Sequence, residues 1–189
     1  MRRTKGMTIL VFIIAILSIP TYGCAIRSMI QGQVIDAQDG RPIENATVLI
    51  EWTKPLSYVP GFPGSSVVEV AEAVSDSKGY FKIPKHYALS HDYRLTIYKK
   101  GYVCWNNEKI FPTYEDRKDF KLKDGMVIKM EYFQSGYSKF DHADFTLTSS
   151  LGRTSAGVFD EAIKEEREIR TEHYRKLREE DDIRRGKAK

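Results

Sequence analysis

Two spacings of apolar residues divide the chain into a β-rich part and a helical part. Between Met29 and Lys100, apolar residues recur at every second position, which is typical of strands because successive side chains point to opposite faces. Turns rich in Gly, Asp, Asn and Pro separate these segments, and the pattern predicts a mainly β protein built as an antiparallel sandwich. The alternation places Phe81, Val48 and Ile97 in its core. The predicted strands are 30–36, 46–52, 67–74, 80–84 and 93–100.

The C-terminal part predicts a charged α-helix. Residues 158–185 contain neither proline nor glycine, and several acids stand four residues before a base, a pairing that stabilises a helix. The apolar stripe is thin and is interrupted by Glu166 and His173. We therefore expect a helix that docks on the sandwich by its first turns and is otherwise solvated. A partner-binding or self-associating helix is the alternative, although no heptad repeat supports a coiled coil.

The segment between these two parts is less regular. Residues 119–133 predict a further strand of the sandwich, with a turn at 123–125 supplied by Lys-Asp-Gly. Residues 143–150 predict another strand or an extended linker.

The N-terminus predicts an export signal. A basic patch precedes the apolar run Met7–Ile19, which is shorter than the roughly 20 residues of a membrane-spanning helix and suits the core of a signal peptide. Pro20 then breaks the helix, and the small residue Gly23 stands directly before Cys24. This boundary resembles the lipobox of bacterial lipoproteins, in which the cysteine becomes the first mature residue and carries acyl chains such as palmitate.

The lipobox resemblance implies a protein held on a membrane by a lipid attached to Cys24. Multiple acyl chains make a durable anchor, since each buried CH₂ contributes about 0.8 kcal/mol. Thr21 and Tyr22 depart from the family's preference for Leu and a small residue, so ordinary cleavage or an uncleaved anchor stays open. Ala25 follows the cysteine where an acid would imply inner-membrane retention, so the outer membrane is favoured. The remaining cysteine, Cys104, is expected to be a small buried residue.

The charge balance argues against nucleic acid as a partner. The whole chain has 30 basic and 26 acidic residues, but removing residues 1–23 takes away Arg2, Arg3 and Lys5 and no acid. The mature chain is then nearly neutral, and it has no basic stripe with interleaved aromatic residues of the kind that binds nucleic acid.

Five short motifs occur in order along the β-rich part. They are Ile-x-Gly-x-Val-x-Asp at 30–36, Pro-Ile at 42–43, Ala-x-Val at 46–48, Asp-x-x-Gly-x-Phe at 76–81 and Gly-Tyr at 101–102. Together they resemble the carboxypeptidase regulatory-like domain family. The resemblance implies an antiparallel Ig-like or transthyretin-like β-sandwich that serves as an accessory module.

These observations predict three regions and a non-catalytic role. We expect a lipoprotein-type signal peptide at 1–23, the β-sandwich at 24–148, and a linker with the charged helix at 149–189. The chain has no G-x-S-x-G, phosphate-loop or H-E-x-x-H motif, so no catalytic residue, cofactor or metal is predicted. The expected role is structural or binding work in the cell envelope, as a membrane-anchored protein with an envelope protein or glycan as partner.

Two other functions stay open. The first is a carbohydrate- or peptide-binding accessory module that acts through the loop 53–66, where Tyr58 and Phe62 are candidate ligand-binding residues. The second is an enzyme with an unrecognised site around His86, His91 and Asp92, residues that we otherwise interpret as ordinary loop positions. A Ca²⁺ site could form only if three turn aspartates converged, namely Asp36, Asp39 and Asp76.

Overall fold

The computed structural model describes residues 28–55, 64–86, 92–151 and 157–186. The predictions made for the signal peptide, Cys24, Tyr58, Phe62 and His91 lie outside these residues. Within the described part, no helix is both long enough and apolar enough to cross a membrane.

Nine strands and three helices follow one another along the described chain. All five strands predicted from the alternation are present, with ends that differ by up to three residues. The strands are β1 (Met29–Asp36), β2 (Thr47–Pro55), β3 (Ser65–Val74), β4 (Tyr80–Pro84), β5 (Asp92–Tyr98), β6 (Trp105–Asn106), β7 (Lys109–Ile110), β8 (Glu115–Asp116) and β9 (Met126–Met130). The helices are α2 (Lys139–Thr148), α3 (Val158–Ala162) and α4 (Lys164–Arg184).

The strands form two main sheets, in the orders β4-β1-β9 and β3-β2-β5-β6. Their pairs are antiparallel apart from β1 and β9, which run parallel, so the expectation of a purely antiparallel sandwich is wrong at this one pair. A separate two-stranded ribbon joins β7 to β8. The predicted turn at 123–125 leads directly into β9.

The two sheets pack face to face around one apolar core, which confirms a mainly β sandwich. Side chains that alternate along β1, β4 and β9 meet those of β2, β5 and Trp105. Phe81, Val48 and Ile97 are all buried there, as their strand positions predict. The hydrophobic effect of this burial is the main force that holds the sheets together.

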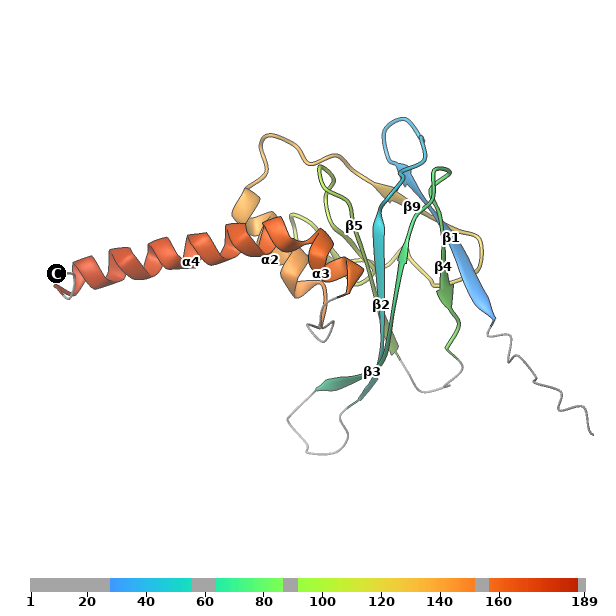
Figure 1. Cartoon of the computed structure of the whole chain (residues 1–189), viewed down its shortest axis with the longest axis horizontal. Coiled ribbons are helices and arrows are strands. Elements are labelled where there is room, and N and C mark those ends of the chain that lie inside the picture. The colour runs from blue at the N-terminus through green and yellow to red at the C-terminus, as the bar shows by residue number, and fades with distance from the viewer. Residues whose placement is uncertain (1–27, 56–63, 87–91, 152–156, 187–189) are drawn as a thin grey trace, which may run out of the picture.

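The helices form a third layer on the outer face of the four-stranded sheet (Figure 1). Strand β2 is buried on both faces because Val48 and Ile50 point between the sheets, whereas Leu49 points toward the helices. Leu49 and Tyr98 pack there against Phe145 of α2, Phe159 of α3 and Ile163 between α3 and α4. The sandwich therefore has a second apolar core beneath its helices.

Residues 143–150, expected as a strand or linker, are largely helical. They belong to α2, which begins after Ser138, whose side chain accepts a hydrogen bond from the Asp141 backbone N–H. This contact is a typical N-cap. The buried positions of α2 recur at helical spacing, but half of them are polar, so a hydrophobicity pattern does not reveal the helix. They are His142, Ala143, Phe145 and Thr146.

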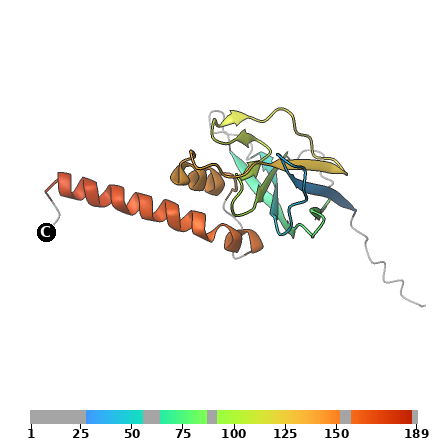
Figure 2. The same ribbon diagram turned by 90° about the horizontal axis from the view of Figure 1, so that it is seen from above.

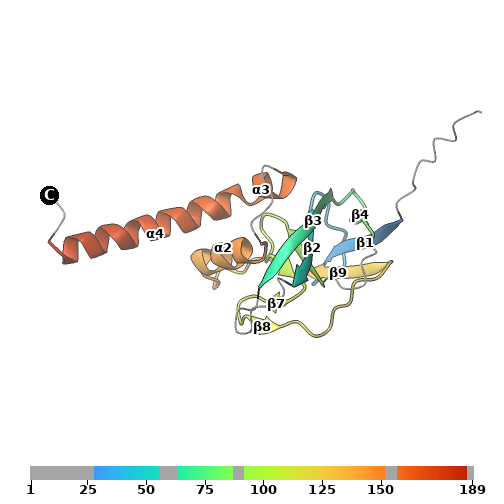
Figure 3. The same cartoon turned by 90° about the horizontal axis from the view of Figure 1, so that it is seen from below.

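The predicted C-terminal helix is present but is broken at Ile163, which has φ −93° and ψ 12° and separates α3 from α4. The first turns of α4 dock on the body, as expected. Phe140 of α2 stacks on His173 with ring centroids 3.7 Å apart, and Asp144 pairs with Arg170, so α2 and α4 lie antiparallel. The C-terminal half of α4 projects beyond the sheets (Figures 2 and 3).

Two glutamates on the outer sheet face accept hydrogen bonds from backbone N–H groups near the ends of the helices. The fully buried Glu51 accepts hydrogen bonds from the Leu151 backbone N–H at 3.0 and 2.9 Å, one to each carboxylate oxygen. Glu72 accepts one from the Val158 backbone N–H at the start of α3. Burial raises the pKa of the Glu51 carboxyl above its usual value of 4.5, although the Leu151 N–H and Arg94 oppose the shift.

We expect Glu51→Gln to change how stability depends on pH. Because the folded state holds the Glu51 proton more tightly than the unfolded state does, ionising this group lowers the free energy of unfolding as pH rises above about 4.5. Glutamine keeps an oxygen acceptor and cannot ionise. Relative to the wild type, the variant should therefore gain stability between about pH 4.5 and neutral pH. The gain is about 1.4 kcal/mol for each tenfold difference in proton affinity between the folded and unfolded states.

Urea unfolding followed by circular dichroism across this pH range measures the effect. Glu44→Gln, at an exposed position before β2, is the matched control for losing one negative charge. A difference between Glu51→Gln and the wild type that stays constant with pH would contradict the interpretation.

Candidate binding pocket between the sheet edge and the helices

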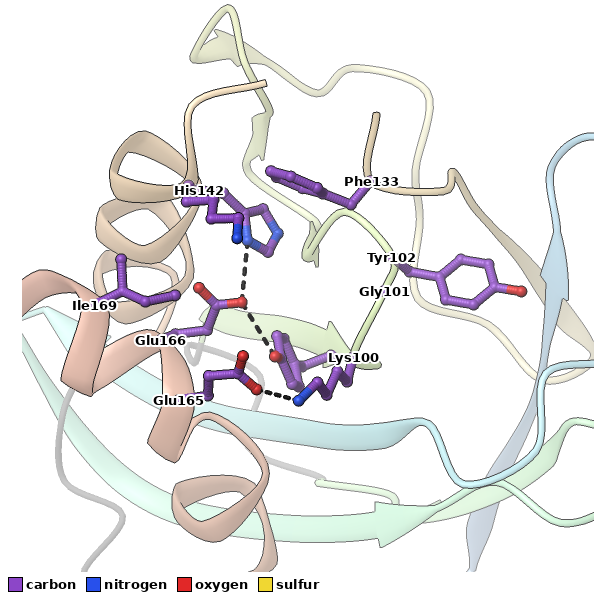
Figure 4. Close-up of a pocket in the computed structure, with 10 residues that line it drawn as sticks. Lys100, Gly101, Tyr102, Phe133, His142, Glu165, Glu166 and Ile169 are labelled. Carbon is purple, nitrogen blue, oxygen red and sulfur yellow. Dashed lines mark hydrogen bonds and ion pairs between the residues drawn. The ribbon is translucent and has the colours of Figure 1, made fainter. Parts of the chain in front are cut away.

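A small pocket lies where the turn after β5 meets α2 and the first turns of α4 (Figure 4). Its volume is about 130 Å³, and its lining joins residues that are far apart in the sequence. Tyr98 is the last residue of β5 and Lys100 lies in the turn after it, whereas His142 comes from α2 and Glu166 from α4. The docking of α4 on the sheet therefore creates the pocket.

The base of the pocket is a hydrogen-bonded group of three side chains. One oxygen of Glu166, Oε1, accepts from the Tyr98 hydroxyl at 3.1 Å and lies 3.2 Å from Nδ1 of His142. All three residues are buried. Burial and the Glu166 carboxylate raise the pKa of the Tyr98 phenol, so this hydroxyl stays a hydrogen-bond donor.

The hydrogen bond from the Cys104 backbone indicates the tautomer of His142. The Cys104 N–H donates to Nε2 of His142 at 3.0 Å, so Nε2 carries no proton. The neutral imidazole then has its proton on Nδ1, from which it donates to Glu166. Both ring nitrogens are engaged, and in this geometry His142 is not free to act as a general base.

Cys104 itself is buried, as predicted, with 2% of its surface exposed. Burial raises the pKa of its thiol to about 12, although contacts with Thr146 and Ser149 act in the opposite direction. The thiolate is the nucleophilic form of cysteine, so a thiol with this pKa is unreactive at neutral pH.

The rim of the pocket carries charge and aromatic surface. Lys100 forms an ion pair with Glu165, and this contact raises the pKa of the Lys100 amine. Phe133 and Lys139 complete the rim near α2. The ring of Tyr102 points away from the pocket, and its hydroxyl donates to Asp36 at 3.1 Å (Figure 4).

The sequence pattern does not identify Glu166 as a site residue. Its charge interrupts the predicted apolar stripe, yet Phe159, Ile163 and Glu166 follow one another at helical spacing and are all buried. The helical spacing of these three residues is therefore the sequence feature from which the burial of Glu166 could have been predicted. A carboxylate on the docking face of a helix implies hydrogen-bond donors on the surface that the helix covers, because a buried charge needs hydrogen bonds.

The other candidate residues from the sequence do not converge on a metal site in the described part of the chain. No three His, Cys, Asp or Glu side chains there lie close enough together to hold an ion. Nδ1 of His86 lies 2.8 Å from Glu69, and its ring stacks on Trp52. Asp92 begins β5.

The three aspartates considered for Ca²⁺ act in their own turns. Asp36 accepts from the Gln38 and Asp39 backbone N–H groups, and Asp76 accepts from those of Lys78 and Tyr80. Asp39 accepts from the backbone N–H of Arg41. Each of the three therefore caps its own turn rather than contributing to a shared site.

The loop predicted at 53–66 is shorter than expected. Residues 53–55 continue β2 and residues 65–66 begin β3, so the strands extend into both ends of the predicted loop. Tyr58 and Phe62 lie outside the described residues. Their role in ligand binding stays a prediction.

Comparisons with known proteins give only weak similarities. No protein-family model matches the chain, and no curated protein matches its sequence. Among solved structures, a 9R-lipoxygenase from Cyanothece PCC8801 matches 59% of this chain with 15% identity and a TM-score of 0.31, over 18% of the lipoxygenase.

Two further structures match at a similar level. Catechol 1,2-dioxygenase from Acinetobacter sp. ADP1 matches 57% of this chain with 13% identity and a TM-score of 0.31, over 53% of its own length. The major plantain pollen allergen matches 58% of this chain with 10% identity and a TM-score of 0.32, over 97% of its length. Similarities this weak assign neither a family nor a function, and the resemblance to the carboxypeptidase regulatory-like family stays a prediction.

Proposed function

We propose that this protein is a lipid-anchored, non-catalytic binding module of the bacterial cell envelope, and that its binding site is the pocket above Glu166. The observation that carries the binding role is the geometry of the pocket base. Its Tyr, His and Glu side chains are fixed by mutual hydrogen bonds, with both nitrogens of His142 engaged. A rigid set of polar groups in a partly enclosed pocket favours recognition of a ligand.

The anchor is the second part of the proposal, and it rests on the Gly23–Cys24 boundary and the short apolar run before it. Strand β1 begins at the end of the molecule that is remote from the free end of α4 (Figures 1 and 3). A lipid at Cys24 stands five positions before Met29, the first residue of β1. Such an anchor would leave α4 and the pocket facing away from the membrane surface.

The family assignment is the third part. The five ordered motifs support a carboxypeptidase regulatory-like, transthyretin-like sandwich. Members of this family act as accessory modules, which agrees with a binding role. The outer membrane is the proposed destination, since the residue after Cys24 is Ala25 rather than an acid.

We expect Cys24→Ser to release the protein from the membrane fraction or to leave it as an unprocessed precursor, because serine has no thiol to which the lipid can be attached. Fractionation of cell envelopes with immunoblotting measures this, and mass spectrometry of the wild-type N-terminus shows the acyl chains. Cys104→Ser is the matched control and should stay in the membrane fraction. Normal N-terminal processing and unchanged membrane fractionation of Cys24→Ser would rule the lipid anchor out.

A further inference from the structure

Glu166 is a buried carboxylate that forms no direct ion pair with a lysine or arginine among the described residues, although Lys100 interacts with it electrostatically at longer range. Its two neighbours, the Tyr98 hydroxyl and the neutral His142 imidazole, are both uncharged donors. No lysine or arginine in the part of the chain that the structure describes forms an ion pair with it. Charged side chains are rarely buried unless they are paired, so this carboxylate is unusual.

The carboxylate also has unused capacity to accept hydrogen bonds. Both donors approach the same atom, Oε1, whereas Oε2 receives no hydrogen bond from any described residue. A carboxylate accepts about four hydrogen bonds, so Oε2 can still accept from a further donor. Glu166 lines the pocket, so a donor that enters the pocket can reach it (Figure 4).

The lysine and arginine side chains nearest to the pocket do not donate a hydrogen bond to Glu166. Lys100 forms its direct ion pair with Glu165 and reaches Glu166 only at longer range, and Arg170 pairs with Asp144. Lys139 is exposed at the first position of α2 and lines the rim. Its charge disfavours a ligand with several positive groups, so a ligand with a single cationic end fits best.

The pocket is too small for a whole metabolite. Its volume of about 130 Å³ lies below the range of roughly 300–1,000 Å³ that is usual for small-molecule sites. It accepts the end of one side chain, with apolar surface from Phe133 and Ile169 for an alkyl stem. Charged side chains often bury their stem along apolar surface in this way.

An ammonium group matches the acceptor better than a guanidinium group does. A guanidinium binds a carboxylate best through two parallel hydrogen bonds, one to each oxygen. Oε1 already receives two donors, so only Oε2 is available. An ammonium is a compact charge that can bind through a single oxygen.

We infer that the pocket binds the primary ammonium group of a lysine side chain on a partner protein, held by Glu166. This inference rests on the proposed binding function and specifies its ligand chemistry. The lysine enters between Lys100 and Lys139, its stem lies on Phe133 and Ile169, and its ammonium donates to Oε2 of Glu166.

The test uses n-butylammonium as the probe for a lysine side chain, titrated into the purified chain and followed by two-dimensional amide NMR. Saturable shifts are expected for residues around the pocket, among them Gly101, at millimolar probe. The neutral 1-butanol and the anionic butyrate have similar alkyl stems and should give no saturable shift there. Glu166→Gln should weaken n-butylammonium binding at least about tenfold, which corresponds to about 1.4 kcal/mol.

A second variant keeps the test valid if Glu166→Gln does not fold. Lys139→Glu changes an exposed residue outside the hydrogen-bonded base, and it should strengthen n-butylammonium binding several-fold by removing a repulsive charge. Lys123→Glu, in the turn before β9, is the matched control and should leave binding unchanged.

The outcomes separate this inference from the proposed function. Equal shifts with n-butylammonium and 1-butanol, or unchanged affinity in both Glu166→Gln and Lys139→Glu, would overturn the inference. Saturation by butyrate alone would show a binding pocket with the opposite ligand charge, which overturns the ammonium assignment and leaves the binding function standing. No saturable shift with any of the three probes would overturn both.

Discussion

Replacing Phe159 by alanine should lower the free energy of unfolding by about 3–5 kcal/mol, the usual cost of truncating a buried phenylalanine. Phe159 is 0% exposed and lies in α3 against the outer face of the four-stranded sheet. It packs in the second apolar core with Leu49 and Phe145, so its loss leaves a cavity between the sheet and the helices. Urea unfolding followed by circular dichroism measures the effect.

The projecting half of α4 supplies the matched control. Leu177 is 46% exposed, and Leu177→Ala should change the free energy of unfolding by less than about 0.5 kcal/mol. Deleting residues 175–189 should remove helical signal and leave the melting temperature nearly unchanged, because the ion pairs of this part are at the surface. A Phe159→Ala cost as small as that of Leu177→Ala would show that the helical layer is not part of the folded core.

The β-sandwich could be predicted from the sequence because its strands alternate regularly. In β1 and β4 the buried and less buried residues follow period two, and the turns between them carry Gly, Asp and Pro. The parallel pairing of β1 with β9 could not be predicted, since side-chain alternation is the same for both strand directions.

The helical layer was only partly predictable. Strand β2 carries Thr47, Leu49 and Glu51 on the face that the helices cover, and two of these residues are polar although all are buried. A pattern of this kind resembles a solvated face. Leu49 was the one residue that indicated a covering element, and a single apolar residue is too weak a signal to predict one.

The pocket could not be predicted because its residues meet only after α2 and α4 dock. His142 and Glu166 are 24 positions apart in the sequence and lie on helices that pack antiparallel. The boundary predicted at 148–149 also separates α2 from the helix that it packs against. A domain boundary drawn from the spacing of apolar residues falls where that spacing changes. In the fold, however, the helices on both sides of this boundary pack on the same face of the sheet.

A second large loss of stability is expected from substitutions at Phe81 of β4 and Gly32 of β1, which face each other in the paired strands. The two residues are directly opposite in the antiparallel pair, and Phe81 is buried in the core between the sheets. Phe81→Ala should therefore lower the free energy of unfolding by about 3–5 kcal/mol. A cost within about 0.5 kcal/mol would mean that the ring does not contribute to the core.

Gly32 leaves the space that the Phe81 ring occupies. A Cβ atom placed on Gly32 would lie 2.4 Å from Cζ of Phe81, far inside van der Waals contact, so Gly32→Ala should cost about 1–3 kcal/mol by overpacking. Gly136→Ala is the control, because a Cβ there meets no atom within 4 Å.

In the Phe81→Ala background the new methyl group of Gly32→Ala would occupy part of the vacated space. The double variant should then be more stable than the sum of the two single costs predicts, by about 0.5–3 kcal/mol, and strictly additive costs would show that residue 32 is a glycine for some reason other than the ring opposite.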